Sequence, residues 1–321
     1  MIILSTRQTR DGDWTYFKAD DDVPRYYAVG STGSVALADV TEIPDPDDAI
    51  NRLVAEAKRL MPTSPMIVVF VHGYNNTVAT AANTAQTLFE GLELAGLAPA
   101  MAFLSWSTDG KLENYIQDRS DARVSALIVS RILRRFSDNA DIASGAVALD
   151  VVSHSMGNYL IDFACESMGL GGAIPTRLFH HSVLVAADIN RDDLNVGQEG
   201  DLRCRMSNQV TFYYDGWDGT LALAEIVLHR QRFGKYGPHH WEQLYANTLG
   251  VNCSDVIRAH TNNPIDATWE VGVGIHSAYF ADPTFYGDLK QVFEGAVPAN
   301  MSTRQHPDGV PPNSFRLKVP S

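Results

Sequence analysis

The chain has 321 residues, of which 45% are hydrophobic and 20% charged, as is ordinary for a globular protein with a large buried core. Its formal net charge of −13 argues against a general binder of nucleic acids or anionic membranes, because both need a positive field. The three cysteines, Cys165, Cys204 and Cys253, are odd in number and widely spaced, which excludes a disulfide framework and a zinc ribbon.

The predicted elements begin with β structure at residues 2–4, 25–30 and 35–40, with a turn at 31–33. A helix follows, in which Asp45 is the expected cap and Pro46 occupies the first turn.

From residue 66 onwards, apolar runs and helical periodicity alternate, which is typical of strands covered on both faces by helices. The last helix is expected to begin at Asp282-Pro283. The strands are predicted at 66–71, 101–106, 147–153, 182–187, 210–214 and, more weakly, 269–275, and the helices at 77–95, 120–136, 158–168 and 221–228.

This alternation predicts an α/β fold: a doubly wound, mostly parallel sheet with helices on both faces and antiparallel strands at the N-terminus. We expect one domain over residues 1–297. The long connections 188–209 and 229–268 are candidates for a lid or an insert. Residues 298–321, rich in Pro, Asn and Ser, are expected to form a loosely packed C-terminal tail.

The sequence also bears on location. No apolar stretch approaches the ~18 residues of a membrane span, and the first residues lack the pattern of a signal peptide. These features favour a cytoplasmic location, with a processed precursor as the alternative. The oligomeric state stays open.

The strongest local signal is Ser-His-Ser-Met-Gly-Asn at 153–158, between a predicted strand and a predicted helix. This is the context of a nucleophile elbow of the G-x-S-x-G type, in which a serine stands on a sharp turn above the sheet. Gly157 provides the small residue that close packing of strand and helix requires, whereas Ser153 replaces the first glycine. We therefore predict Ser155 as a nucleophile and the backbone N–H of Met156 as one oxyanion donor.

A second signal, His72-Gly73-Tyr74-Asn75, follows the strand at 66–71. A turn at this point is where the second oxyanion donor belongs, and the backbone N–H of Tyr74 is the candidate. His72 is expected to fix the loop by hydrogen bonds, because in this chain order the catalytic base follows the nucleophile.

A serine nucleophile needs a base and an acid that orients the base, in the order Ser, acid, His. His276 lies between the last predicted strand and the last helix, which is the required place for the base. Three carboxylates follow predicted strands and are therefore candidates for the acid: Asp218, Asp215 and Asp188. Asp218 is favoured, with Asp215 and Asp188 as alternatives.

Two pairs of adjacent histidines are candidate metal ligands: His180-His181 and His239-His240. Successive residues of a strand point to opposite faces, which argues against a metal shared by the first pair. The second pair lacks a carboxylate or cysteine at ligand spacing. The sequence therefore predicts no metal.

Together these segments resemble the α/β-hydrolase superfamily and, more narrowly, an uncharacterised bacterial esterase/lipase-like group with an H-G-Y-N oxyanion loop and an S-H-S-M-G-N elbow. The resemblance implies a Ser-Asp-His hydrolase without a cofactor, and it places the family's acid on Asp218. Trp217 beside this acid is unusual and keeps Asp215 open as the alternative. The likeness runs from residues 2–7 to 276–279 and includes 69–76, 103–106, 186–189 and 213–221.

The resulting hypothesis is a serine hydrolase that cleaves small-molecule carboxylic esters through an acyl-enzyme on Ser155. A lactonase, thioesterase, amidase or acyltransferase would use the same triad, because all of these reactions pass through a tetrahedral oxyanion. The alternative from a different class is an inactive binding module that keeps the scaffold.

Overall fold

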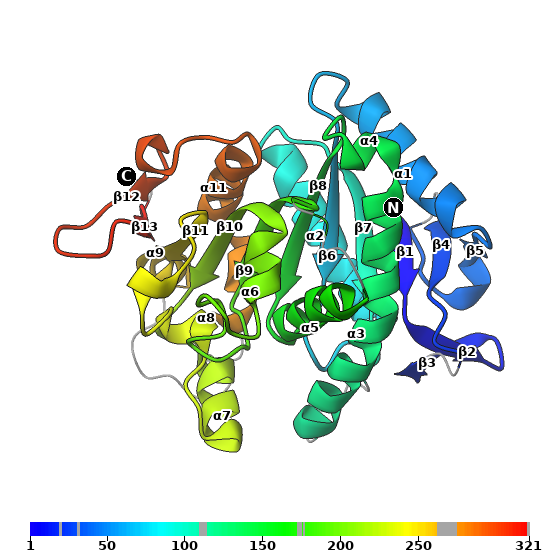
Figure 1. The fold of residues 1–321 in the computed structure, drawn as a ribbon, viewed down its shortest axis with the longest axis horizontal. Coiled ribbons are helices and arrows are strands. Elements are labelled where there is room, and N and C mark those ends of the chain that lie inside the picture. Colours follow the sequence, from blue (N-terminus) through cyan, green and yellow to red (C-terminus); the bar gives the residue numbers. More distant parts are fainter. Residues whose placement is uncertain are drawn as a thin grey trace.

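The central sheet organises the whole chain. The structure is a computed structural model, which describes residues 1–18, 21–30, 33–108, 114–171, 175, 177–261 and 275–319. Within these residues, eleven strands form one sheet in the order β12-β13-β11-β10-β9-β8-β6-β7-β1-β4-β5 (Figure 1). Neighbouring strands from β13 to β1 pair in parallel, and β4, β5 and β12 add antiparallel strands at the two ends. The predicted fold class is therefore confirmed.

The strands are short and mostly buried. Each of the six residues of β6 is buried, as expected of a strand with helices on both faces. The sheet comprises β1 (Ile2–Ser5), β4 (Arg25–Val29), β5 (Val40–Glu42), β6 (Met66–Val71), β7 (Ala100–Ser105), β8 (Ala148–His154), β9 (Phe179–Val185), β10 (Ser207–Tyr214), β11 (Thr248–Asn252), β12 (Arg304–Gln305) and β13 (Ser314–Leu317), and a separate hairpin pairs β2 (Arg7–Arg10) with β3 (Asp13–Lys18).

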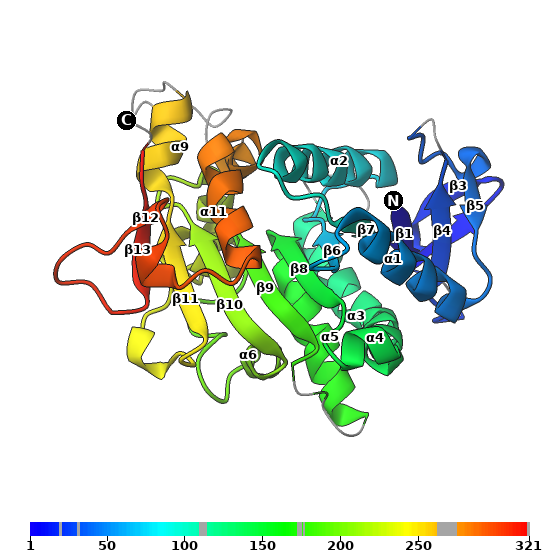
Figure 2. The ribbon, with the colours of Figure 1, turned by 90° about the horizontal axis from the view of Figure 1, so that it is seen from above.

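Helices cover both faces of the sheet (Figure 2). On one face lie α1 (Pro46–Leu60), α3 (Tyr115–Asp138) and α5 (Met156–Leu170), and on the other lie α2 (Val78–Leu94), α9 (Ser254–Thr261) and α11 (Pro283–Phe293). The connections carry α4 (Ala140–Ala143), α6 (Asp201–Arg205), α7 (Gly219–Leu228), α8 (Phe233–Tyr236) and the 3₁₀ helices η1 (Leu37–Asp39), η3 (Trp241–Gln243), η4 (Ala278–Ala281) and η5 (Pro298–Asn300).

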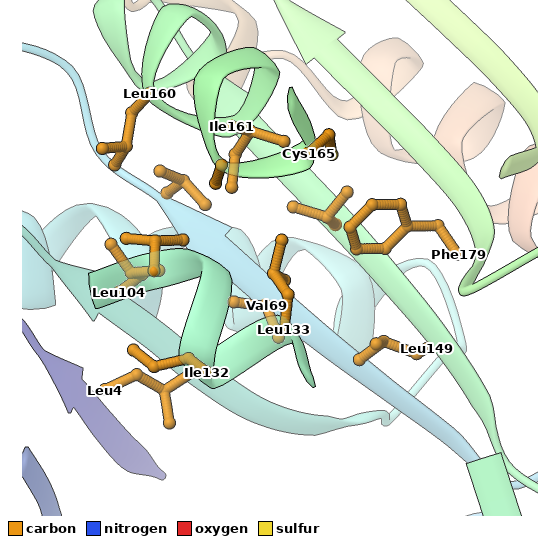
Figure 3. Close-up of a cluster of buried hydrophobic side chains, with 14 of the residues drawn as sticks. Leu4, Val69, Leu104, Ile132, Leu133, Leu149, Leu160, Ile161, Cys165 and Phe179 are labelled. Atoms are coloured by element: carbon orange, nitrogen blue, oxygen red, sulfur yellow. The ribbon is translucent and has the colours of Figure 1, made fainter. Parts of the chain in front are cut away.

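Two apolar cores, one on each face, hold the layers together. Figure 3 shows part of the first core, in which side chains of the sheet meet those of α3 and α5. Burying one such Leu, Ile or Phe side chain contributes about 1.5–3 kcal/mol, so the two cores dominate the stability of the fold. The labelled side chains are Leu4, Val69, Leu104, Ile132, Leu133, Leu149, Leu160, Ile161, Cys165 and Phe179. No helix among the described residues is both long enough and apolar enough to cross a bilayer.

Local sequence signals explain the helix boundaries. The Asp45 side chain accepts a hydrogen bond from the N–H of Asp47, and Pro46 occupies the first turn of α1, as predicted. One predicted strand is wrong, because residues 35–40 form η1 and only the first residue of β5. The N–H of Asp39 donates to the carbonyl of Ala36, so a local turn replaces the extended backbone.

The expected loose tail at 298–321 is also wrong. Strand β13 pairs in parallel with β11, and its Phe315 and Leu317 are buried. The connection 229–268 likewise contains a strand of the sheet, β11, rather than only an insert. Gly250 in β11 weakens the strand signal, yet a Cβ there would lie 2.3 Å from the Phe212 ring, so the packing requires glycine.

The connection 188–209 contains α6. The strand predicted at 269–275 falls, except for Ile275, outside the described residues. The remaining predicted strands and helices are confirmed, with ends shifted by a few residues.

The order of the strands places the candidate site. Strand β6 lies between β7 and β8, so the chain leaves β6 to one side and returns to β8 on the other. In open parallel sheets, the crevice at such a switch point, outside the carboxyl ends of the strands, is where ligands bind. The segments that follow β6 and β8 are those singled out in the sequence.

Candidate active site

Ser155 forms the sharp turn between β8 and α5. Its backbone has φ 53° and ψ −125°, a strained conformation for a residue with a side chain. Its N–H donates to the Val185 carbonyl at 3.0 Å, and its own carbonyl accepts from the N–H of Asp188 at 3.1 Å and the side-chain amide of Asn158 at 3.0 Å. These bonds hold the strain in place, and the turn predicted around Ser155 is present.

Two glycines make room for this turn. A Cβ on Gly157 would lie 2.6 Å from the His72 carbonyl oxygen and 2.8 Å from that of Val71. A Cβ on Gly73 would lie 3.0 Å from the Cβ of Ser155. The segment after β6 and the start of α5 therefore touch each other. The contact at Gly157 excludes a side chain, and the contact at Gly73 leaves little room for a Cβ.

Ser153, which departs from the glycine of the elbow pattern, has a specific partner. Its hydroxyl donates to Asn158 Oδ1 at 2.6 Å and accepts from a terminal nitrogen of Arg203 at 2.6 Å. Arg203 is fully buried and also donates to Asp162 Oδ1 at 3.2 Å. Burial raises the pKa of Asp162 to about 7, although the Arg203 charge opposes the rise. The sequence did not reveal Arg203, because it lies in a predicted connection without a local motif.

His72 fixes the loop after β6, as predicted. Its Nδ1 donates to the Gly73 carbonyl at 2.7 Å, and its Nε2 accepts from the Trp106 N–H at 3.2 Å. The two rings are stacked with centroids 5.3 Å apart. Burial lowers the pKa of His72 to about 3, so the ring is neutral and both hydrogen bonds persist at neutral pH.

The loop that carries Tyr74 is also held from outside. The Asn75 N–H donates to Thr108 Oγ1 at 2.9 Å and to Asp118 Oδ2 at 3.3 Å, and Arg7 donates to the Asn76 carbonyl at 2.9 Å.

The two candidate oxyanion donors, the backbone N–H groups of Tyr74 and Met156, have no acceptor among the described residues. Met156 is the first residue of α5, where backbone N–H groups lack a partner within the helix. Tyr74 also lines the cavity that contains Ser155.

His276 and Asp218 form a buried pair. His276 Nδ1 donates to Asp218 Oδ2 at 2.7 Å, and Asp218 Oδ1 accepts from the Leu221 N–H at 2.9 Å, which caps α7. Burial lowers the pKa of His276, but the charge and hydrogen bond of Asp218 outweigh this effect, so the pKa lies above its ordinary value.

The other ring nitrogen of His276, Nε2, is buried and has no hydrogen-bond partner among the described residues. His276 and Ser155 line the same cavity, of about 190 Å³, together with Gly73, Tyr74 and Leu223.

The two alternative acids have other partners. Asp215 Oδ1 accepts from the Trp217 N–H at 3.1 Å, and burial raises the pKa of Asp215. Asp188 accepts from the Tyr115 hydroxyl at 2.6 Å and pairs with Arg232 at 3.4 Å. Of the three candidates, Asp218 is the one that contacts His276 within the described residues.

His154 is a neighbour that the sequence did not reveal as a site residue. Its Nε2 donates to the backbone carbonyl of His276 at 3.0 Å, and the two ring centroids lie 4.6 Å apart. Burial lowers the pKa of His154 to about 3, so it acts as a neutral support for the loop that carries His276. Its place inside the S-H-S-M-G-N motif was the available signal.

The two histidine pairs differ from each other. His239 and His240 lie on the surface with centroids 6.4 Å apart, beside Asp192 and Glu242. The argument that strand alternation separates His180 from His181 is wrong, because their ring centroids are only 4.2 Å apart.

Residues 53–270, more than half of the chain, match the family model described as "alpha/beta hydrolase of unknown function (DUF900)". The chain belongs to this family. A search of curated proteins found no match. The α/β-hydrolase membership agrees with the parallel sheet and with the turn at Ser155.

Among solved structures, the chain is similar to lipase B of Aspergillus fumigatus, with 12% identity and a TM-score of 0.43. That match covers 82% of this chain and 61% of the lipase, less than two thirds of its length. It is also similar to a cutinase-like protein from Cryptococcus sp. (14% identity, TM-score 0.37, 73% and 97% of the two chains). A third similar structure is an acetylxylan esterase (10% identity, TM-score 0.38, 72% and 96%).

Proposed function

We propose that the chain is a serine hydrolase that cleaves carboxylic esters through an acyl-enzyme on Ser155. The observation that carries this proposal is the strained turn at Ser155. Ser155 and His276 line the same cavity, and His276 is hydrogen-bonded to Asp218. A nucleophile, a base and an orienting acid in this order are what acyl transfer requires.

In the acylation step, Ser155 Oγ attacks the acyl carbon and its proton passes to His276 Nε2. The alcohol leaves with that proton, so His276 acts first as base and then as acid. Asp218 accepts the hydrogen bond from Nδ1–H, so the proton stays on Nδ1, the lone pair stays on Nε2, and the carboxylate stabilises the imidazolium as it forms. Water then attacks the acyl carbon and gives a proton to His276 Nε2. The bond between the acyl carbon and Ser155 Oγ breaks, His276 returns the proton to Ser155, and the carboxylic acid leaves.

The negative oxygen of the tetrahedral intermediate needs donors that are already in place. The N–H groups of Tyr74 and Met156 suit this role, since neither has an acceptor among the described residues. The N-terminus of α5 adds positive dipole at the same position. One such donor is worth about 10²–10³ in kcat.

The size of the cavity favours a small substrate. About 190 Å³ is below the ~300–1,000 Å³ of pockets that hold drug-sized ligands. Phe70 and Leu223 supply apolar surface, and Thr84 and Asn76 supply polar groups. We infer that short acyl groups, such as acetyl or butyryl, are preferred.

The test compares two serines that line the same cavity, Ser155 and Ser277. Ser155→Ala is expected to reduce turnover of short p-nitrophenyl esters by orders of magnitude, and Ser277→Ala to leave it within a few-fold. Undiminished turnover by Ser155→Ala refutes the proposal. Labelling by a fluorophosphonate separates a live nucleophile from an inactive binding module, and a panel of lactones, thioesters, amides and acyl acceptors separates the reactions that share the triad.

A further inference from the structure

Three side chains with metal-ligand atoms converge at the far end of β8 from Ser155. One ligand atom each from Asp150, His180 and His181 lies within 4.8 Å of the other two. Asp150 lies in β8, five residues before Ser155 in the turn that follows the strand, a separation of about 16 Å. The cluster therefore lies toward the amino ends of β8 and β9, whereas the candidate active site lies at the carboxyl ends of the strands. Figure 2 shows β8 and β9 side by side.

The two histidine rings contact each other next to the point where β9 begins to pair with β8. The paired register of β8 and β9 begins at Val151 and Ser182, one residue after His181. The N–H of His181 donates to the Asp150 side chain at 2.7 Å instead of to a backbone carbonyl. His180 thus precedes the pairing of β9 with β8, although β9 already pairs with β10 from Phe179, and the His180 ring packs edge-on against that of His181.

Two buried polar atoms of the cluster lack hydrogen bonds. Asp150 Oδ2 and His180 Nδ1 have no hydrogen-bond partner among the described residues, although Asp150 itself is fully buried. Leaving such atoms unsatisfied is costly, and native proteins nearly always supply a partner. His180 Nδ1 lies 3.9 Å from Asp150 Oδ1, too far for a hydrogen bond but suitable for two ligands of one ion.

We propose that Asp150, His180 and His181 bind a divalent transition-metal ion of the zinc class. Two imidazole nitrogens and one carboxylate oxygen form a donor set that Zn²⁺ prefers, whereas Mg²⁺ and Ca²⁺ prefer oxygen ligands alone. The His180 side chain is 42% exposed, so an ion reaches the cluster from solvent. A neighbouring cavity of about 250 Å³, which His180 lines, has room for the water that completes four-coordination.

The hydrogen bond between His181 and Asp150 indicates where the ion would bind. His181 Nδ1 donates a hydrogen bond to Asp150 Oδ1 at 2.9 Å, and the bound ion takes the place of the hydrogen between these two atoms. The bound ion links β8 to β9 before their regular pairing begins, and it therefore stabilises the fold rather than the reaction.

Zinc binding to the metal-stripped full-length protein tests the proposal. Titration with ZnCl₂ in a calorimeter is expected to give one ion per chain, and Tm is expected to rise by about 5 °C at a hundredfold excess over Kd. His180→Ala, at a half-exposed position that tolerates substitution, is expected to weaken binding by more than about tenfold and to remove the shift in Tm. Asp150→Asn tests the carboxylate without a change of shape.

The matched control is the exposed pair. The double variant His239→Ala/His240→Ala is expected to bind zinc as the unchanged protein does. The visible spectrum of bound Co²⁺ is expected to persist in this control and to disappear in His180→Ala. Binding that survives both His180→Ala and Asp150→Asn, or that the control variant abolishes, overturns the proposal, as does the lack of any binding. The readouts are independent of ester hydrolysis, so this proposal and the proposed function fail separately.

Discussion

Replacing Ser153 by alanine tests how much the hydrogen bonds of Ser153 to Arg203 and Asn158 contribute to the stability of the turn at Ser155. The hydroxyl of Ser153 joins fully buried Arg203 to Asn158 through two hydrogen bonds of 2.6 Å each. Ser153→Ala leaves a donor of the guanidinium without this acceptor, at about 1.5–3 kcal/mol, and removes a neutral bond worth about 1 kcal/mol. The expected loss of unfolding free energy is therefore about 2.5–4 kcal/mol. At about 2 °C per kcal/mol, Tm falls by roughly 5–8 °C.

The assay is urea unfolding followed by circular dichroism, with Ser125→Ala as the matched control. Ser125 is also fully buried, but its hydroxyl has no hydrogen-bond partner among the described residues. Its removal is therefore expected to change stability by less than about 0.5 kcal/mol. If the two variants lose the same stability, the network around Arg203 does not support the elbow and the reasoning is wrong.

Three further predictions concern the reaction and the elbow. Asp218→Asn is expected to lower kcat/KM by about 10³–10⁴, because an amide no longer fixes the His276 tautomer, whereas Asp215→Asn stays within about tenfold; equal losses contradict the assignment of the acid. The pH profile of kcat/KM is expected to fall on the acid side with a midpoint above the ordinary histidine value of about 6.5, since activity needs neutral His276 and Asp218 raises its pKa; a midpoint below 6 contradicts this. Gly157→Ala is expected to lower stability by about 1–3 kcal/mol, measured by thermal unfolding, because its Cβ would press on backbone oxygen; unchanged Tm contradicts the close contact.

The parallel core of the fold could be predicted because its strands are continuous apolar runs. The six buried residues of β6 show this pattern, and so does β7. Strands β11 and β13 escaped prediction because each adds only a few residues at one end of the sheet. Gly250 interrupts one, and the other owes its burial to pairing with a strand more than sixty residues earlier in the chain. Such long-range pairing leaves no periodicity in the local sequence.

The candidate site divides in the same way. Ser155 and Gly157 occupy a local pattern whose backbone demands can be read from residue types alone, and the observed φ of 53° at Ser155 meets them. Asp218 and His276 could be proposed from strand ends, chain order and the family resemblance, which left Asp215 and Asp188 as alternatives. The contact with His276 is made by Asp218 and supports the first choice. The contacts of Arg203 with Ser153 and of His154 with the carbonyl of His276 could not be predicted, because they join residues that are far apart in the chain.

The departure at Ser153 shows how a break in a local pattern carries information about a distant residue. A glycine there would satisfy the packing of the elbow, but it would remove the acceptor that Ser153 offers to Nη2 of the buried Arg203 guanidinium. Arg203 in turn reaches Asp162 and Ser182, on α5 and β9, so one charged side chain ties three elements beneath the turn. A buried arginine is tolerated only when its donors are satisfied. Ser153 in β8 supplies one of the acceptor oxygens that Arg203 needs. The serine in the first position of the motif is therefore explained by the connection 188–209, which supplies the arginine that requires it.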